Sequence, residues 1–561
     1  MRTLATFGFV AGLGGLIGAL TGCADHPYEP DVSVLDPYAP KVHITSPGRG
    51  TFAGEVAMLV VTGTASDDAR VASVQVNGIA AAIAGDGTWS ATIPVGIGTQ
   101  LIQAVARDAD GNAGKESRAV VVGPLRPIAT AVPQAITAAI SAQTFEAIGT
   151  GVAGYVRTGQ LAAAIAPSNP VIDLDGGPEL FAQGSVTSAA VGEATSVALT
   201  PGPGGLALDV ELDRVVVGMH LDYAVAWLDG SRDVTIAASH IKVAGTLHAG
   251  IASGGAGAGF DVALVDQDVQ ITGLDIDLGG VPGAVVDLLH LDAAIAPIVG
   301  LAIEKLVVPV LNDALAELND VNTVEVLGTP IDIQVAPAQI RFDASGAIVE
   351  LDTSLRARSD TASPGYVYVA NELPVMSTER GFELAVADDA ANQLLGSFWA
   401  AGGIDHTFDL TTGSYGSLGQ LYDRVELSAK VPPFVDASGG SLKLTIGDLV
   451  ATFRNGDAVA TQVAINAAVD VKVVTGPDGL PRLDVGAPTT YVDVLDEGVD
   501  GSNTLSNAQF EAITSFALGR VIAVGSGLVG AVPLPSFGGV AVHGVGIAAS
   551  AGYLVVGGDI Q

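Results

Sequence analysis

Cysteine is almost absent from the chain, because Cys23 is the only one among 561 residues. An intramolecular disulfide framework, a cysteine-rich zinc module and an iron–sulfur cluster are therefore excluded. Positive charge is also scarce: 24 Lys and Arg stand against 60 Asp and Glu, which gives a net charge of −36. A surface this acidic repels phosphate backbones, so we expect no nucleic acid as a partner.

The motifs of common enzymes are missing as well. The sequence holds no Gly-x-Ser-x-Gly, no His-Glu-x-x-His and no phosphate-binding Gly-Lys-Ser/Thr loop. The eight histidines are scattered, and His240 and His248 could share one sheet but match no standard site spacing. We predict no catalytic residue, no metal ligand and no cofactor, and we expect that the chain is not an enzyme. An envelope hydrolase with an unrecognised site is an alternative.

Two acidic segments have part of the pattern of a calcium site. Asp108, Asp110 and Asn112 have the spacing with which a calcium loop begins, but Ala stands where that loop needs Gly and Glu. A polar turn between strands is the better interpretation. The acidic residues from Asp496 to Asp500 are interpreted in the same way, as a solvated loop.

The N-terminal residues have the composition of an export signal. Arg2 precedes an uncharged apolar stretch from Phe7 to Leu20, which is short for a stable membrane span. The Leu-Thr-Gly-Cys run that ends at Cys23 resembles a bacterial lipobox. This resemblance implies that residues 1–22 are a lipoprotein signal peptide and that Cys23 carries the lipid. An ordinary signal peptide with an incidental cysteine is the alternative.

The residue that follows the lipidated position bears on localisation. It is Ala24 rather than Asp, which in enteric bacteria directs a lipoprotein to the outer membrane. Residues 23–40 contain four prolines, a spacing that favours an extended tether. We therefore expect a lipid-anchored protein of the bacterial cell envelope, at the outer membrane, held away from the membrane by this tether.

Residues 41–123 consist of short alternating segments separated by turn signals. Val74 and Val76 precede the turn signal Asn77-Gly78, and Trp89 begins another alternating run. Regular short strands with such turns predict a β-sandwich. The runs VASVQVNG, GDGTWSATIPV and LIQAVARDADGNAG resemble bacterial extracellular immunoglobulin-like modules, which implies a role in spacing or docking.

The remaining region, residues 124–561, combines long strands with a few helices. Apolar residues at helical spacing predict helices over about 133–165, 294–318 and 388–401, and a fourth from about Ser506. Alternation predicts strands around 206–212, 331–335 and 469–473, each with one apolar face. Near Gly273 the apolar phase flips, which predicts a bulge that bends the strand.

The order of these elements repeats, as helix, strands, helix and strands. A long apolar-faced helix laid along a strongly curved sheet forms an elongated half-barrel, and such an aliphatic interior suits an acyl chain. We therefore predict an α+β fold with two elongated half-barrels, residues 124–375 and 376–561, on long helices and curved antiparallel sheets. An all-β immunoglobulin-like sandwich precedes them.

Three segments of this region resemble one known family. The run VPLPSFGGVAVHGVGIAASAGYLVVGGDI resembles the ending of bactericidal/permeability-increasing proteins, within the tubular lipid-binding superfamily. The run ANQLLGSFWAAGGI, residues 391–404, is similar to the first helix of that family's second half. Residues 329–352 resemble the segment of the central sheet that joins the halves. The resemblance implies two apolar pockets for acyl chains.

The sequence departs from that family in two respects. The disulfide that the first half of the family usually holds has no counterpart in residues 124–561, and a basic tip is not expected in so acidic a chain. The resemblance therefore implies acyl-chain burial and says nothing for a cationic headgroup site. Candidate pocket-lining residues, for each of which ordinary core packing is the alternative, are Ile136, Ile140, Ile148, Val152, Ile303, Leu306, Val310, Leu394, Phe398, Phe510, Ile513 and Phe516.

Together these features predict a lipid-binding envelope lipoprotein, with lipid transfer as an extension of that role. The expected partners are a phospholipid or another acyl lipid, and the membrane through the N-terminal anchor. The alternative is a surface adhesion or scaffold lipoprotein whose interior is closed by side chains.

Overall fold

The computed structural model describes eighteen ranges of the chain. They are residues 39–68, 70–158, 161–175, 180–225, 228–254, 257–277, 279–281, 300, 303–304, 308, 322–326, 328–359, 363–379, 381–412, 418–475, 481–486, 488–496 and 542–560. Outside them lie Cys23, Leu306, Val310, Phe510, Ile513 and Phe516, most of the helix predicted over 294–318 and the whole of the helix predicted from Ser506.

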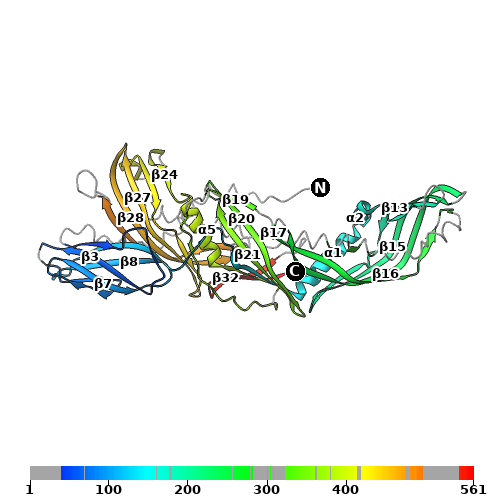
Figure 1. Cartoon of the computed structure of the whole chain (residues 1–561), viewed down its shortest axis with the longest axis horizontal. Coiled ribbons are helices and arrows are strands. Elements are labelled where there is room, and N and C mark those ends of the chain that lie inside the picture. The colour runs from blue at the N-terminus through cyan, green and yellow to red at the C-terminus, as the bar shows by residue number, and fades with distance from the viewer. Residues whose placement is uncertain are drawn as a thin grey trace.

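The molecule is elongated and consists mostly of β-sheet (Figure 1). An N-terminal module lies at one end, beside the lobe that contains β27 and β28. A sheet that contains β20, β21 and β32 occupies the middle, and a second lobe with β15 and β16 forms the other end. We call these parts the module, lobe 2, the central sheet and lobe 1.

The module is an immunoglobulin-like sandwich of two sheets, with strand orders β1-β3-β7-β6 and β2-β9-β8-β4-β5. Strict alternation places Trp89, Ala91 and Ile93 of β7 in the core, together with Ile44 and Ile102. The strands are β1 (Lys41–Ser46), β2 (Thr51–Gly54), β3 (Met58–Ser66), β4 (Ser73–Val76), β5 (Ile79–Ala80), β6 (Ala82–Ile83), β7 (Thr88–Pro94), β8 (Gly98–Arg107) and β9 (Ala113–Val122).

The central sheet has the order β19-β20-β21-β11-β23-β32-β31, and all of its pairs are antiparallel. It unites strands from both predicted half-barrels, because β11 pairs with β21 on one side and with β23 on the other. A separate two-stranded ladder joins β10 (Leu125–Arg126) to β22 (Tyr366–Val367). The strands of the central sheet are β11 (Val132–Ser141), β19 (Asn322–Val326), β20 (Thr329–Asp343), β21 (Gly346–Ala357), β23 (Phe382–Ala387), β31 (Val542–Ser550) and β32 (Tyr553–Ile560).

Each lobe has one strongly extended antiparallel sheet. In lobe 1 the order is β12-β13-β15-β16-β17, with β14 on β15 and β18 on β16; in lobe 2 it is β24-β25-β27-β28-β29, with β26 on β27 and β30 on β28. The strands of lobe 1 are β12 (Ile172–Asp175), β13 (Leu180–Ala190), β14 (Ser196–Gly202), β15 (Gly205–Val225), β16 (Leu228–Gly254), β17 (Gly257–Thr272) and β18 (Asp275–Asp277). The strands of lobe 2 are β24 (His406–Asp409), β25 (Arg424–Ala429), β26 (Phe434–Asp436), β27 (Leu442–Asn455), β28 (Ala458–Thr475), β29 (Pro481–Val485) and β30 (Thr489–Asp496).

The longest described helices are α1 (Ala142–Arg157) and α5 (Asp388–Ala400), with shorter ones at α2 (Leu161–Ile165), η4 (Ala166–Ser168), η5 (Leu410–Thr412) and α6 (Leu418–Leu421). The prediction of α5 is confirmed nearly to the residue. The described part of the chain does not show the long helices expected on the sheets.

The predicted helix from Pro133 is wrong over its first part. Val132–Ser141 forms strand β11, and the helix begins only after Ser141, whose side-chain oxygen accepts a hydrogen bond from the Thr144 amide at 3.2 Å. Ile136 and Ile140 therefore belong to a strand rather than a helix. Because β11 is paired on both sides and largely buried, its apolar residues do not alternate, and helical spacing fits them by chance.

The predicted change of phase near Gly273 is present, but the predicted bulge is not there. Gly273 has φ of +65°, and the pairing of β17 and then β18 with β16 continues across it in the same register. The register shift lies earlier, between Ala244 and Thr246, opposite Asp266 with φ of 54°. Neighbouring β15 also changes phase, from buried Leu212 to buried Val215, around Arg214 with φ of 45°. The change of phase thus crosses several strands, and it keeps one face of the lobe 1 sheet apolar.

Candidate functional site

The interior of lobe 1 is lined by aliphatic side chains from the sheet and from α1. The helix approaches β14 closely because Gly149 has no side chain: a Cβ there would lie 2.5 Å from the carbonyl oxygen of Val197. The apolar cluster includes Val152, Val156 and Phe145 of the helix, and Phe145 contacts Phe342 of β20 with ring centroids 6.3 Å apart. The lobe 1 interior therefore continues to the edge of the central sheet.

Four of the candidate pocket residues meet in this interior. Val152 and Ile303 are buried members of the cluster, and Ile140 and Ile148 are partly buried and pack against it. Ile148 is thus the helix residue among the four that retains exposure at the edge of the cluster.

A second apolar interior lies between α5, the central sheet and lobe 2. Three other candidates, Ile136, Leu394 and Phe398, belong to it, and Phe398 is fully buried. The structure therefore divides the described candidates between two apolar clusters, one for each lobe. All seven make packing contacts within these clusters.

Two buried carboxylates at the start of α5 fix this helix to its surroundings. Asp388 accepts hydrogen bonds from the Ala437 amide at 2.9 Å and from Asn371 at 3.0 Å, and Asp389 accepts one from the Val369 amide at 3.0 Å. Burial raises the pKa of Asp388 to about 6 and that of Asp389 to about 7. The sequence did not single out this pair, although two adjacent Asp residues ahead of an apolar helical run are a visible signal.

The module docks on lobe 2 through a buried polar cluster. Arg49 of the module donates to Asp448 of β27 and, at 3.2 Å, to Asp493 of β30. Asp493 also accepts from the amide of Ser117 and from its hydroxyl, the latter at 2.8 Å. Burial raises the pKa of Asp493 to about 6, against the effect of Arg49 and Ser117. Asn466 of β28 donates to the hydroxyl of Ser117 at 3.0 Å. We call Arg49, Ser117, Asp448, Asn466 and Asp493 the docking cluster.

Apolar contacts complete this junction. Ala119 and Val121 of the module form one buried cluster with Val431 and Phe434 of lobe 2. Phe52 contacts Trp399 of α5, with ring centroids 6.0 Å apart. The junction therefore combines buried hydrogen bonds with apolar packing.

A third polar arrangement lies on the surface of lobe 1. His220 of β15 faces Asp233 of β16, with 2.7 Å between Nδ1 and the carboxylate, and its Nε2 lies 2.7 Å from the hydroxyl of Ser231. The hydrogen bond with Asp233 raises the pKa of His220 above 6.5, and Asp222 adds to this effect. The carboxylate of Asp233 thus stabilises the protonated form of this exposed imidazole.

Residues 108–112 form the polar turn that the sequence indicated. One oxygen of Asp108 accepts hydrogen bonds from the amides of Asp110, Gly111 and Asn112, at 2.7 to 2.9 Å. Among the residues the structure describes, no group of three or more His, Cys, Asp or Glu side chains could hold a metal ion. In the same part of the chain, no helix combines the length and the apolar character of a membrane span.

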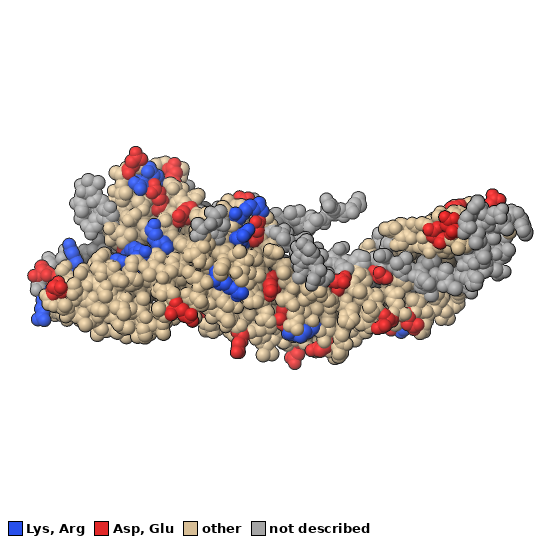
Figure 2. Space-filling view, in the orientation of Figure 1, with Lys and Arg blue, Asp and Glu red and all other residues tan. Residues whose placement is uncertain are grey.

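The distribution of charge also bears on ligands. On the face shown in Figure 2, Lys and Arg lie mainly over the module, lobe 2 and the central region, whereas Asp and Glu occur along the whole length. The described surface of lobe 1 on this face is therefore not basic.

Comparison with known proteins gives one family match and several structural similarities. The family described as glucodextranase, domain B, matches residues 40–123, which form the module. No curated protein matches the chain.

Three solved structures are similar over part of the chain. Lipopolysaccharide binding protein is 15% identical with a TM-score of 0.39, and the match covers 77% of this chain and 99% of that protein. P47 of Clostridium botulinum E1 is 9% identical with a TM-score of 0.24 over 77% of this chain and 100% of its own. The fibronectin(III)-like modules of Clostridium thermocellum CbhA are 12% identical with a TM-score of 0.14, over 35% and 92% respectively.

Proposed function

We propose that this protein is a lipid-binding lipoprotein of the bacterial envelope, which shields acyl chains in the apolar interiors of its two lobes and catalyses no reaction. The observation that carries the proposal is the pair of apolar clusters, each built where a helix crosses an extended sheet. The change of phase across β15, β16 and Gly273 supports the proposal, because this change keeps one face of a long sheet apolar towards a single interior.

The energetics of acyl burial are sufficient for such a role. At about 0.8 kcal/mol for each CH₂ removed from water, a chain of sixteen carbons gains roughly 10 kcal/mol before the costs of ordering. An apolar interior can therefore hold a lipid without a charged contact to its headgroup. This agrees with an acidic protein whose visible face of lobe 1 carries few cations.

The lipobox-like run at Cys23 supports the second part of the proposal, which is attachment to the outer membrane through an N-terminal lipid. A Cys23→Ala variant should be unprocessed or released in soluble form when cells are fractionated. Unchanged attachment to the membrane would contradict the anchor and would leave the lipid-binding proposal to its own test.

Native mass spectrometry of the protein purified from its own membrane tests lipid binding. We expect copurifying phospholipid or another acyl lipid, and an Ile148→Trp variant should hold less because the larger ring enters the lobe 1 interior. Thr150→Trp is the matched control, since Thr150 is exposed on the same helix. Repeatedly empty protein, or equal lipid in both variants, would favour the adhesion or scaffold alternative.

A further inference from the structure

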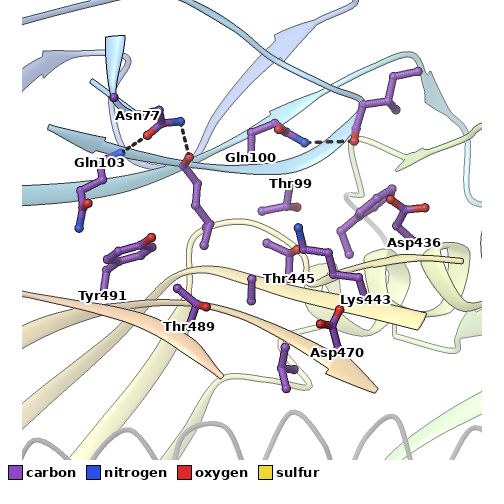
Figure 3. A pocket seen from close by; sticks show the side chains of 16 residues that line it. Asn77, Thr99, Gln100, Gln103, Asp436, Lys443, Thr445, Asp470, Thr489 and Tyr491 are labelled. Carbon is purple, nitrogen blue, oxygen red and sulfur yellow. Dashed lines mark hydrogen bonds between the residues drawn. The ribbon is translucent and has the colours of Figure 1, made fainter. Parts of the chain in front are cut away.

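A cavity of about 670 Å³ with a mostly polar lining lies between the module and lobe 2 (Figure 3). One wall is formed by β8 and the Asn77 turn of the module, and the other by strands β26, β27, β28 and β30. The docking cluster and the apolar cluster that includes Val121 and Phe434 join these walls. The volume of the cavity is in the size range of small-molecule sites.

The walls present amides, hydroxyls and carboxylates. Figure 3 shows Gln103 on the module side and Tyr491, Thr489, Lys443 and Asp470 on the lobe side, all directed towards the space between the two layers. Within the described part of the chain, the side chains of Gln103, Lys443 and Asp470 make no hydrogen bond or ion pair with protein groups. Their donors and acceptors are therefore free for a ligand.

The charges of the cavity select against anions. Lys443 lies between two carboxylates on the adjacent strands, because it is paired with Asp436 of β26 and with Asp470 of β28. One cation beside two anions, in a protein of net charge −36, does not favour a phosphate or a carboxylate. The polar lining also does not favour an acyl chain, since its polar groups would lose their hydration without a replacement.

A ligand rich in neutral hydroxyls satisfies these conditions. Each sugar hydroxyl both donates and accepts, so it can pair with the amide of Gln103, the carboxylate of Asp470 and the ammonium of Lys443. Tyr491 adds an aromatic face beside a polar tip, which can contact the less polar face of a sugar ring. We infer that this cavity is a binding site for a neutral saccharide, one segment of a glycan.

Isothermal titration calorimetry of the full chain with maltohexaose, isomaltohexaose, cellohexaose and chitohexaose tests this site. We expect saturable binding of at least one of the four, with the Kd raised tenfold or more by Tyr491→Ala and threefold or more by Gln103→Ala. Tyr155→Ala is the control, because Tyr155 is an exposed tyrosine of α1 in lobe 1 and does not line the cavity. It should leave the Kd unchanged, and polygalacturonate should not compete.

Failure of all four sugars to bind would overturn the inference. Binding that neither cavity variant weakens would overturn it too, because the sugar would then occupy another site. Copurifying lipid, measured on the same variants, separates this result from the proposed lipid function: Tyr491→Ala and Gln103→Ala should retain the lipid content of the unaltered protein.

Discussion

Arg49 and Asp448 form an ion pair across the junction of the module and lobe 2, although 399 positions separate them in the sequence. Asp448 also accepts from the Ala119 amide at 3.1 Å, and its own amide donates to Asn466 at 2.8 Å. One guanidinium thus compensates two buried carboxylates, those of Asp448 and Asp493.

Replacement of Arg49 by Met should destabilise the protein by about 3–5 kcal/mol, because it leaves buried carboxylates without their cation. Chemical denaturation followed by fluorescence measures the change in the free energy of unfolding. The loss should be smaller at pH 5 than at pH 8: without Arg49 the pKa of Asp493 rises further above about 6, and the protonated carboxyl carries no unpaired charge.

Arg358→Met is the control for this variant. Arg358 pairs with Asp332 at 2.6 Å, but its side chain is 59% exposed, so its removal should cost less than about 1 kcal/mol. Equal losses for the two variants would mean that the docking cluster contributes no more than an exposed ion pair.

Replacement of Asp389 should stabilise the protein at high pH, whereas replacement of Arg49 should destabilise it most there. Its pKa is about 7 in the folded protein against 3.8 in a free side chain, so the folded state favours the protonated form. The associated stability is present in full below pH 4 and is lost as the pH rises towards 7. Asp389→Asn stays neutral and can still accept from the Val369 amide, so it should stabilise the protein at pH 8 by roughly 2–4 kcal/mol.

Thermal unfolding from pH 4 to pH 8 measures this effect, with Asp343→Asn as the control. The hydrogen bonds from Ser345 lower the pKa of the exposed Asp343, so its contribution is lost as the pH falls. Asp343→Asn should therefore not raise the melting temperature at pH 8. A melting temperature of Asp389→Asn that is unchanged or lower at pH 8 would contradict the assignment of a raised pKa.

His220 should titrate above its ordinary pKa of 6.5, because Asp233 hydrogen-bonds to its Nδ1. NMR titration of the imidazole Cε1 proton measures this pKa directly. Asp233→Asn removes the charge of the partner and should lower the pKa of His220, whereas Asp261→Asn on β17 should leave it unchanged. A pKa of 6.5 or less for His220 in the unaltered protein would show that the hydrogen bonds of His220 with Asp233 and Ser231 are not formed in solution.

The sequence predicted those helices and strands in which the spacing of apolar residues within the segment itself shows which face is buried. The helix over 388–401 matched α5 because apolar residues at helical spacing are followed by Gly402 and Gly403, and alternation located β7 and the apolar half of β15. Strand β11 was misassigned because a strand buried on both faces has no alternation to detect. The cap at Ser141 was the local signal that could have placed the helix correctly.

The sites between parts of the chain could not be predicted in this way. Arg49 and Asp448, and the cavity residues Gln103 and Asp470, come together only through docking of the module. None of them differs in local pattern from an ordinary surface residue. Each described candidate for the apolar interiors lies in an apolar cluster, because burial of one face follows from spacing alone. That these residues line a lipid pocket stays a prediction.

The turn after α5 gives a test of the packing of the lobe 2 interior. A Cβ on Gly403 would lie 2.5 to 2.7 Å from three ring carbons of Phe398, which is fully buried and cannot move without disturbing the cluster. Gly403→Ala should therefore destabilise the protein by about 1–3 kcal/mol through overpacking. Gly439→Ala is the matched control, since nothing lies within 4 Å of its Cβ position; it should change the free energy of unfolding by less than about 1 kcal/mol. Denaturant titration of both variants measures the difference, and equal stabilities would show that the interior around Phe398 has room for an added methyl group.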